Sequence, residues 1–292
     1  MVDTETIKRM QRLSADIRIQ TIKGIASAGF GHIGGSASIA DVLAVLYGAV
    51  MKIDPSNPDW EDRDWLVLSK GHAGPALYAT LALKGYFPME WLETINKPGT
   101  NLPSHCDRLK TPGIDMTTGS LGQGLSAAAG IAMGNKLKSK QNYTYCILGD
   151  GEIQEGQVWE AVQSAAHFKL NNLIVFIDSN KKQLDGRIKE ICEPFDTEAK
   201  FRAFGWNAHT VKGYDVAEIY DAINLSKTSV DKPSVIVLDT IKGLGVNFAE
   251  EVDFNHYLVI DESMAERGIA EIERRYKEGC YPGGDFLNDK TC

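Results

Sequence analysis

The chain has 292 residues, and its 31 basic and 39 acidic residues give a formal charge of −8 at pH 7. Its composition, with 43% hydrophobic and 24% charged residues, is typical of a globular protein and excludes a collagen-like or intrinsically disordered chain. The acidic balance argues against general binding to nucleic acids or anionic membranes, because both are themselves negatively charged.

The sequence shows neither a membrane span nor a secretion signal. No run approaches the ~20 apolar residues that a transmembrane helix needs, and residues 1–5 are acidic, unlike the start of a signal peptide. The five cysteines are odd in number and form no Cys-x-x-Cys pair: Cys106, Cys146, Cys192, Cys280 and Cys292. We therefore expect a cytoplasmic protein with reduced thiols, without a disulfide framework or a structural zinc site.

The N-terminal region begins with apolar residues at helical spacing, which predict an amphipathic helix over residues 4–28. A glycine cluster at 29–36 follows. We expect Ser36 or Ser38 to cap a second helix at 39–51. The glycine cluster is thus predicted to be a loop between two helices.

A short apolar run then predicts a buried strand at 65–69, and a helix is expected at 75–84. Residues 96–119 are rich in Pro, Gly and Thr and are predicted to form a long loop. Loops of this length are uncommon in a compact domain unless they are functional. A β-rich run at 143–148 and a helix at 155–169 come next.

The rest of the chain alternates strands and helices. Residues 173–177 form a continuous apolar run, which predicts another buried strand. Five further elements are expected: a helix at 197–204, a strand at 207–212, a helix at 215–227, a strand at 234–239 and a charged helix at 262–278. This alternation predicts an α/β fold, with a parallel sheet covered by helices on both faces. Without a repeat or a clear linker, we expect one domain over residues 1–292, in which 262–292 form a C-terminal helix and tail.

Polar residues follow two of the predicted strands at the point where each ends. Gly149-Asp150-Gly151 comes directly after the run at 143–148, and Asn180 follows the next strand. The carboxyl ends of such strands meet at one edge of the sheet, where open α/β sheets bind ligands. Carboxylate, amide and carbonyl oxygens suit Mg²⁺ whose shell is completed by phosphate oxygens and water. Gly-Asp-Gly alone is often a simple turn, but this spacing favours a site for a metal and a diphosphate.

Five segments resemble the transketolase family and occur in that family's order. They are Gly-His-Ile-Gly-Gly at 31–35, Leu-Ser-Lys-Gly-His-Ala at 68–73, Met-Thr-Thr-Gly-Ser-Leu-Gly-Gln-Gly at 116–124, Gly-Asp-Gly-Glu-Ile-Gln-Glu-Gly at 149–156 and Ile-Asp-Ser-Asn at 177–180. The first two are similar to the family's histidine loops, the third to its glycine loop over the cofactor, and the last two to its thiamine-diphosphate motif. The resemblance runs over about residues 15–245 and covers only the first half of a usual transketolase.

The resemblance implies a thiamine-diphosphate-binding fold. Because the family's later domains are missing, it also implies the N-terminal subunit of a split, two-chain transketolase. Such an enzyme transfers a two-carbon glycolaldehyde unit from a ketose to an aldose, with thiamine diphosphate and Mg²⁺ or Ca²⁺ as cofactors. The implied partner is a C-terminal subunit that carries the pyrimidine-binding domain, with two copies of each chain. The implied substrates are sugar phosphates or sulfosugars, and neither a nucleic acid nor a membrane is expected as a partner.

The resemblance also implies roles for individual residues. Asp150, Asn180 and the main-chain carbonyl of Lys182 match the metal ligands. The positions matched to the cofactor site are Gly119, Leu121, Gly149, Asp150, Gly151, Asn180, Leu184 and His72. Glu155 matches a buried Glu that communicates across the dimer with the second active site.

Four histidines match catalytic positions that face the substrate and the cofactor: His32, His72, His105 and His256. Neutral imidazole donates and accepts hydrogen bonds near pH 7, so it suits a substrate with several hydroxyl groups. A histidine after a glycine can also be a helix cap or an exposed residue, an alternative that the family order weakens for His32 and His72. His256 departs most from the pattern, because Tyr257 follows it where the family usually has Gly.

Several alternatives stay open. His167 and His209 fall in a predicted helix and strand, which favours structural roles for them. Lys242, in a Lys-Gly-Leu-Gly segment, fits either an anion-binding loop or a solvated turn. Another thiamine-diphosphate enzyme, such as a deoxyxylulose-phosphate synthase or a 2-oxo-acid dehydrogenase α subunit, is a second interpretation. A nucleotide-binding α/β module is a third, but neither a G-x-x-x-x-G-K-[ST] nor a strand-to-helix G-x-G-x-x-G motif supports it.

Overall fold

Five parallel strands form the central sheet of the molecule, in the order β2-β3-β4-β8-β7. We describe a computed structural model of the chain over residues 2–279. The strands are β2 Trp65–Leu68, β3 Thr144–Gly149, β4 Leu173–Ser179, β8 Ser234–Asp239 and β7 Asn207–Lys212. All four neighbouring pairs are parallel, as the apolar runs predict. The α/β fold class is therefore confirmed.

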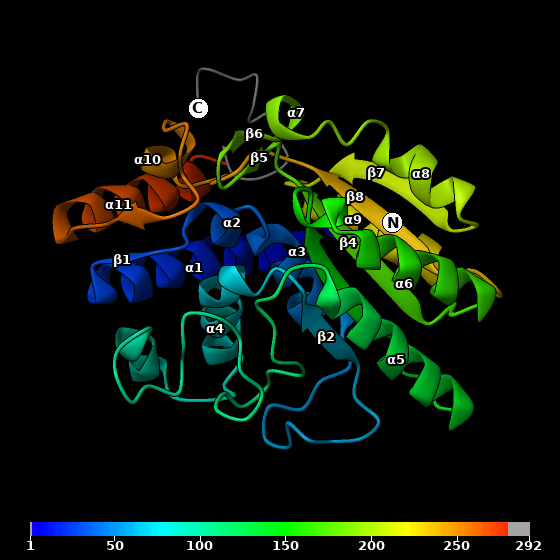
Figure 1. Cartoon of the computed structure of the whole chain (residues 1–292). Coiled ribbons are helices and arrows are strands. Elements are labelled where there is room, and N and C mark those ends of the chain that lie inside the picture. The colour runs from blue at the N-terminus through cyan, green and yellow to red at the C-terminus, as the bar shows by residue number, and fades with distance from the viewer. Residues whose placement is uncertain (1, 280–292) are drawn as a thin grey trace.

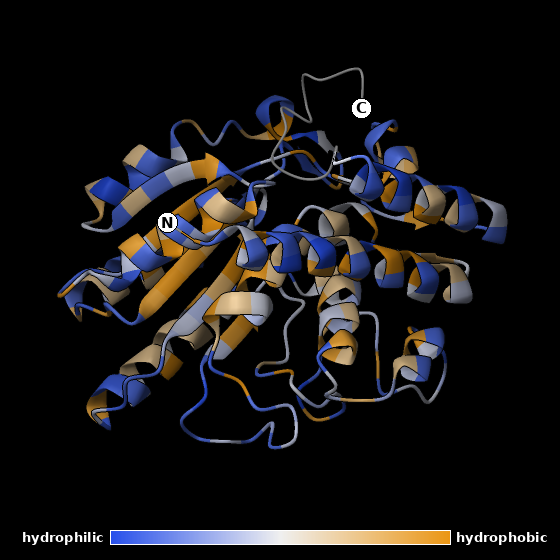
Figure 2. Cartoon of the chain, turned by 180° about the vertical axis from the view of Figure 1, so that it is seen from behind, coloured by the Kyte–Doolittle hydropathy of each residue, from blue (hydrophilic) through white to orange (hydrophobic). Residues whose placement is uncertain are grey.

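Helices cover both faces of this sheet (Figure 1). The helices against one face are α1 Thr4–Ala28, α3 Ala40–Val45, α4 Gly74–Leu83 and α9 Val216–Lys227. Those against the other face are α5 Gln123–Leu137, α6 Gly156–His167 and α8 Thr197–Ala203. Strand residues alternate between the two cores, so that Tyr145 and Ile147 enter the first and Cys146 and Leu148 the second. Figure 2 shows the strands as hydrophobic bands between helices with hydrophilic outer faces. Burial on both faces explains why the strands are continuously apolar.

A third core joins the two ends of the chain. In it, α1 packs against α11 Glu262–Lys277, and α11 packs against α10 Asn247–Glu250. The helix predicted at 262–278 is therefore present, and the predicted tail from residue 280 onward lies outside the described residues. Within residues 2–279, no helix combines the length and the apolar character that crossing a membrane requires.

The remaining elements are short. The helical ones are α2 Gly34–Ala37, α7 Ile188–Ile191, a π-helical turn at Leu46–Val50 and 3₁₀ turns at Gly71–Ala73, Met89–Thr94 and Glu152–Gln154. The extended ones are two antiparallel pairs, β1 Phe30–Gly31 with β9 Leu258–Val259, and β5 Lys182–Gln183 with β6 Gly186–Arg187. Both pairs lie beside the carboxyl edge of the sheet, where they position side chains discussed below.

Two features of the helices differ from the sequence-based expectation. The sequence does not predict helix α5, because its Ala- and Gly-rich segment carries no apolar stripe. The expected serine cap is wrong: α3 begins at Ala40 without a side-chain cap. The hydroxyl of Ser38 instead donates to Asp178 at 2.6 Å, and that of Ser36 donates to the His32 carbonyl at 2.6 Å. Both serines thus fix the loop beside the sheet edge.

Candidate active site

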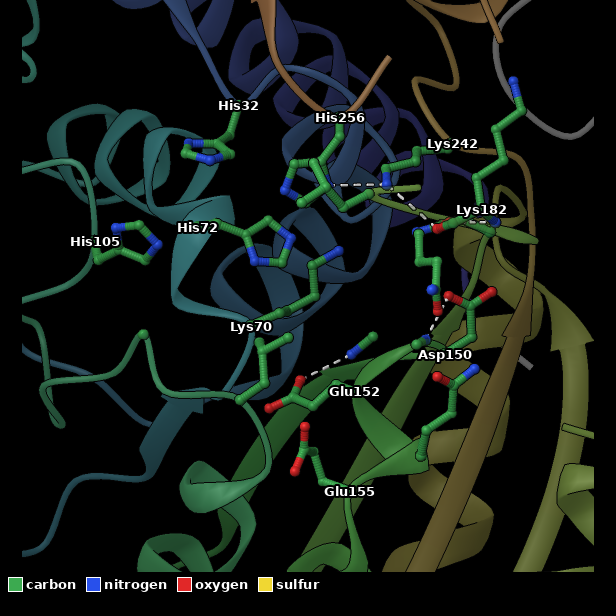
Figure 3. A pocket seen from close by; sticks show the side chains of 18 residues that line it. His32, Lys70, His72, His105, Asp150, Glu152, Glu155, Lys182, Lys242 and His256 are labelled. Carbon is green, nitrogen blue, oxygen red and sulfur yellow. Dashed lines mark hydrogen bonds between the residues drawn. The ribbon is translucent and has the colours of Figure 1, made fainter. Parts of the chain in front are cut away.

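A cavity of about 370 Å³ opens at the carboxyl edge of the sheet. Figure 3 shows the side chains that line it, with histidines on one side and Asp150 and Lys182 on the other. Every residue that the sequence assigns to the site lines this cavity: His32, His72, His105, Gly119, Leu121, Gly149, Asp150, Gly151, Glu155, Asn180, Lys182, Leu184 and His256. Five lining residues are outside that prediction: Lys70, Glu152, Gln154, Gln183 and Lys242. The fold therefore gathers the predicted residues in one place, whereas their individual roles stay predictions.

The candidate metal ligands occupy the ends of β3 and β4. Asp150 and Asn180 are each only 4% exposed. The Asp150 carboxylate accepts hydrogen bonds from the main-chain N–H of Gly151 at 2.9 Å and of Lys181 at 2.7 Å. Oδ1 of Asn180 accepts one from the N–H of Lys182 at 3.1 Å. These contacts hold carboxylate and amide oxygens of the kind that Mg²⁺ and Ca²⁺ prefer.

The electrostatics of Asp150 also fit a bound cation. Burial, together with the nearby negative charge of Asp178, raises the pKa of Asp150 to about 7. A divalent cation beside this carboxylate would reverse that effect by favouring its ionised form. In the described chain no three His, Cys, Asp or Glu side chains cluster as a metal site. The ion would therefore depend on one carboxylate, the amide of Asn180, the carbonyl of Lys182 and oxygens from the ligand.

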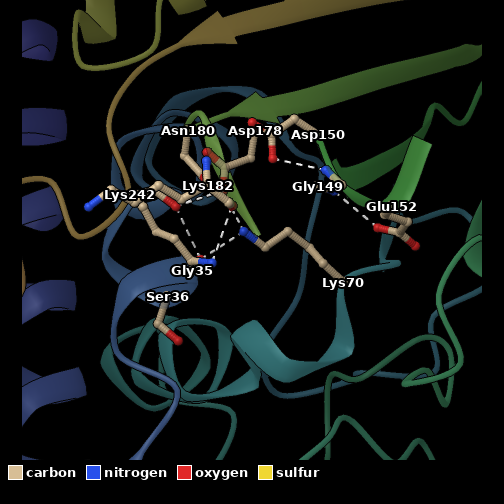
Figure 4. Close-up of polar contacts among 12 residues, drawn as sticks. Gly35, Ser36, Lys70, Gly149, Asp150, Glu152, Asp178, Asn180, Lys182 and Lys242 are labelled. Atoms are coloured by element: carbon tan, nitrogen blue, oxygen red, sulfur yellow. Dashed lines mark hydrogen bonds and ion pairs between the residues drawn. The ribbon is translucent and has the colours of Figure 1, made fainter. Parts of the chain in front are cut away.

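A buried network sets the orientation of Asn180 (Figure 4). The fully buried Asp178 carboxylate accepts hydrogen bonds from Nδ2 of Asn180 at 2.8 Å and from the Ser38 hydroxyl at 2.6 Å. It also forms an ion pair with Lys70, whose ammonium donates to the Gly35 carbonyl at 2.9 Å. Because Asp178 accepts from the amide nitrogen, the amide oxygen of Asn180 is left on the side of the candidate metal site. The network thereby links the two histidine loops to the end of β4.

Glu152 ties three further segments together. Its buried carboxylate accepts hydrogen bonds from the N–H of Gly122 at 2.9 Å, the N–H of Gly149 at 3.0 Å and the hydroxyl of Ser69. Burial raises the pKa of Glu152, and these hydrogen bonds oppose that rise by stabilising the ionised carboxylate. The side chain therefore fixes the glycine loop against the end of β3. The sequence signal that could have identified Glu152 was its position two residues after Asp150.

Four histidine rings form a cluster in the cavity. The ring of His32 lies 5.6 Å from that of His72, 5.5 Å from His105 and 5.2 Å from His256, between centroids. Burial is the main cause that lowers the pKa of His32 to about 4 and of His256 to about 3. Burial also lowers the pKa of His72 and of His105. All four rings are therefore neutral at pH 7 and can exchange hydrogen bonds with uncharged hydroxyl groups.

Lys242 connects this cluster to the candidate metal site. It is only 4% exposed, so the solvated turn is excluded. Its Nζ lies 3.0 Å from Nδ1 of His256 and donates to the Lys182 carbonyl at 3.2 Å. When the ammonium donates to Nδ1, the other ring nitrogen of His256 carries the proton. Burial and the charge of Lys70 lower the pKa of Lys242 to about 8, which keeps it mainly charged at pH 7.

An antiparallel ribbon places His256 beside His32. Residues 29–34 run against 255–260: Ile260 N–H donates to the Gly29 carbonyl at 3.0 Å, and Gly34 N–H to the Asn255 carbonyl at 3.1 Å. A Cβ at Gly34 would lie 2.3 Å from the Asn255 oxygen, so this approach requires glycine. The ribbon explains how a histidine with unfamiliar neighbours still joins the cluster.

The cavity lacks one wall in the isolated chain. Leu121 and Leu184 line it and are 36% and 61% exposed. Glu155, for which the resemblance implies burial, is exposed here. These exposed side chains leave that side of the cavity open to solvent.

Comparison with known proteins identifies the family. The model of the "Transketolase, thiamine diphosphate binding domain" matches residues 9–276. The chain is 51% identical over 265 residues to a 6-deoxy-6-sulfo-D-fructose transketolase subunit of Clostridium sp. (strain MSTE9), covering 91% of this chain and 96% of the relative. It is 36% identical over 243 residues to an apulose-4-phosphate transketolase subunit of Actinobacillus succinogenes, covering 83% and 88%.

The solved structures agree with this result. Transketolase from Campylobacter jejuni superimposes with a TM-score of 0.83 at 29% identity, over 95% of this chain and 47% of that one. The chain therefore belongs to the transketolase family of transferases and contains its thiamine-diphosphate-binding domain. It spans about half of a whole transketolase, whereas it matches separate transketolase subunits over nearly their full length. These matches favour transketolase over the other enzymes and the nucleotide-binding module.

Proposed function

We propose that this chain is the cofactor-binding subunit of a two-chain transketolase, which moves a two-carbon glycolaldehyde unit from a ketose to an aldose. The observation that carries the proposal is a single cavity that combines oxygen donors for a divalent cation with four neutral histidines. The first group suits a metal-bound diphosphate, and the second suits a sugar with several hydroxyls.

The cofactor would bind at the carboxyl edge of the sheet. Asp150, Asn180 and the Lys182 carbonyl would hold Mg²⁺ or Ca²⁺, and Gly149 and Gly151 would let the diphosphate approach the backbone. Gly119, Leu121, Leu184 and His72 would surround its rings. When bound, thiamine diphosphate supplies the nucleophilic carbon that accepts the two-carbon unit and passes it on. The protein supplies orientation, charge compensation and hydrogen bonds.

The histidines would act on the substrate. His32, His72, His105 and His256 would bind sugar hydroxyls through ring nitrogens that are neutral at pH 7. A neutral imidazole held at a hydroxyl can also take up a proton when the C2–C3 bond of the ketose breaks, and return one to the product.

A second polypeptide would complete the site. The open wall beside Leu121 and Leu184 and the exposure of Glu155 support a partner that carries the pyrimidine-binding domain. Two copies of each chain would place Glu155 at the contact between two equivalent sites. The free thiols Cys106, Cys146 and Cys192 fit assembly in the cytoplasm.

Among ketoses, a sulfosugar is the first candidate. The 51% identity to a subunit named for 6-deoxy-6-sulfo-D-fructose exceeds the 36% identity to one named for apulose 4-phosphate. To test this, the chain is co-expressed with its partner and supplied with Mg²⁺, thiamine diphosphate and an aldose acceptor. Turnover is then compared for 6-deoxy-6-sulfo-D-fructose, D-fructose 6-phosphate and apulose 4-phosphate. We expect the highest kcat/KM for the sulfosugar. Transfer from none of the three would contradict the proposed activity.

A further inference from the structure

Two exposed aromatic rings flank the histidine cluster. The ring of Tyr257 lies 5.0 Å from that of His32 and 5.5 Å from that of Phe30, between centroids. Tyr257 is 43% exposed and Phe30 is 41% exposed. Tyr257 therefore bridges a cavity-lining histidine and a second aromatic side chain while keeping nearly half of its own surface open.

The position of Tyr257 is fixed by the ribbon between residues 29–34 and 255–260. Phe30 pairs with Val259 and Gly31 with Leu258, so the same register places His32 opposite Tyr257. The buried amide of Asn255 anchors the ribbon further. It donates to the carbonyls of Lys242 at 2.8 Å and Ala249 at 2.7 Å. The backbone that carries the ring is consequently held in place before any ligand arrives.

Tyr257 lies just beyond the residues that line the cavity and contacts one of them, His32. A series of contacts leads from the candidate metal site towards this ring. Lys242 contacts both the Lys182 carbonyl and the ring of His256, and the ring of His256 lies 5.2 Å from that of His32, between centroids. Tyr257 comes after His32 in this series. Figure 3 shows the same direction, with His32 and Asp150 at opposite sides of the pocket. A substrate that reacts near the cofactor and extends past His32 would meet the Tyr257 ring.

We propose that Tyr257 is a specificity residue, whose ring packs against the distal carbons of a long ketose donor held by His32. The inference rests on the proposed transketolase function. The C–H groups of a sugar present an apolar surface to an aromatic face, whereas its hydroxyls reach the histidines at the side. The ring lies 5.0 Å from that of His32, between centroids, and so gives this chain a contact that a glycine at this position could not make.

The experiment compares a long donor with a short one in the assembled two-chain enzyme. The long donors are 6-deoxy-6-sulfo-D-fructose and D-fructose 6-phosphate. The short donor is hydroxypyruvate, whose loss of CO₂ yields the same two-carbon unit without any distal carbons. For Tyr257→Ala we expect kcat/KM for the better long donor, relative to hydroxypyruvate, to fall about three- to tenfold through KM. Tyr257→Phe keeps the ring and should restore the wild-type ratio.

Phe254→Ala is the matched control, because Phe254 is a 68% exposed aromatic residue of the same segment and is not among the described rings that contact His32. It should leave the donor ratio unchanged. An unchanged ratio in Tyr257→Ala, an equal loss for both donors, or a loss of assembly on a sizing column would overturn the specificity role. If the wild-type enzyme transfers the two-carbon unit from neither the long donors nor hydroxypyruvate, the proposed function itself is refuted.

Discussion

Asp150 is a buried carboxylate at the candidate site, and its ionised form lies beside a second negative charge. Its carboxylate is buried beside Asp178, and the positive groups that act on it are the two buried lysines, Lys70 and Lys242. We expect Asp150→Ala to weaken Mg²⁺-dependent binding of thiamine diphosphate by more than about a hundredfold, since even indirect changes at metal sites cost ~10–100-fold. Calorimetry with the partner present measures this. Asp239→Ala is the control, because Asp239 is an exposed residue at the end of the neighbouring strand β8. Equal affinity of the two variants for thiamine diphosphate would contradict the assignment of Asp150 as a metal ligand.

His32 and His72 are predicted to act on the sugar rather than on the fold. Alanine at either position should lower kcat/KM by ~10²–10⁴-fold, the usual loss when one positioned proton-transfer group is removed. Thiamine-diphosphate affinity should change less than turnover. His167→Ala and His209→Ala serve as controls, because these histidines do not line the cavity. Wild-type turnover in both site variants would leave His32 and His72 without a catalytic role.

The histidine cluster also predicts how stability depends on pH. Above pH 6.5 a histidine is neutral in both the folded and the unfolded chain and contributes nothing. Between pH 6.5 and about 4 the unfolded chain protonates His32 but the folded chain does not, and for His256 this range extends to about 3. The contribution of these two histidines to the free energy of unfolding should therefore fall as the pH drops below 6.5. His32→Gln should make urea midpoints less dependent on pH between 6.5 and 4.5. An unaltered slope in this variant would mean that His32 is not kept neutral by the fold.

At the scale of elements, the five sheet strands and most of the long helices could be predicted, whereas helix α5 and the two short antiparallel pairs could not. The bounds of α1 match the sequence because Asp3 caps it through the Thr6 N–H at 2.8 Å and Gly29 ends it in a left-handed conformation. Helix α5 was not predicted, because it has no apolar stripe and instead packs closely through its small residues. A Cβ at Gly124, for example, would lie 2.4 Å from the Ser69 hydroxyl oxygen. The β1–β9 ribbon joins residues more than two hundred positions apart, which no local pattern reveals.

The ribbon gives a prediction about stability. Gly34→Ala would press a methyl group against the Asn255 carbonyl at 2.3 Å, so the ribbon would have to separate. We expect a loss of about 1–3 kcal/mol in the free energy of unfolding, as for other overpacked sites. Gly130→Ala is the control, because a Cβ there meets nothing within 4 Å and alanine favours a helix. Urea denaturation of both variants measures the difference, and equal stability would show that the ribbon tolerates a side chain.

At the scale of the whole molecule, the sequence predicted the fold class and which residues gather at the sheet edge, whereas the roles of those residues stay predictions. The motifs identified the cavity-lining residues that match the family, since their order fixed which loops meet at the sheet edge. Lys70 and Glu152 lie inside those motifs but were missed, because a motif does not reveal which of its side chains turn inward. Lys242 was ambiguous for the same reason, as burial depends on the distant residues that cover it.

The open wall of the cavity is the feature that most constrains function. A ligand is bound well when most of its surface is buried, and Leu184 at 61% exposure leaves its side of this cavity open to water. The chain alone is thus expected to hold the metal and diphosphate weakly and to lack the groups that act on the cofactor's pyrimidine ring.

The most direct test is to purify this chain alone and assay transfer of the two-carbon unit with Mg²⁺, thiamine diphosphate, a ketose donor and an aldose acceptor, and then to add the partner chain. We predict no turnover by the isolated chain, and turnover that rises with added partner until the two chains are equimolar. Full turnover by the isolated chain would contradict the two-chain account, because it would require a complete active site within these 292 residues.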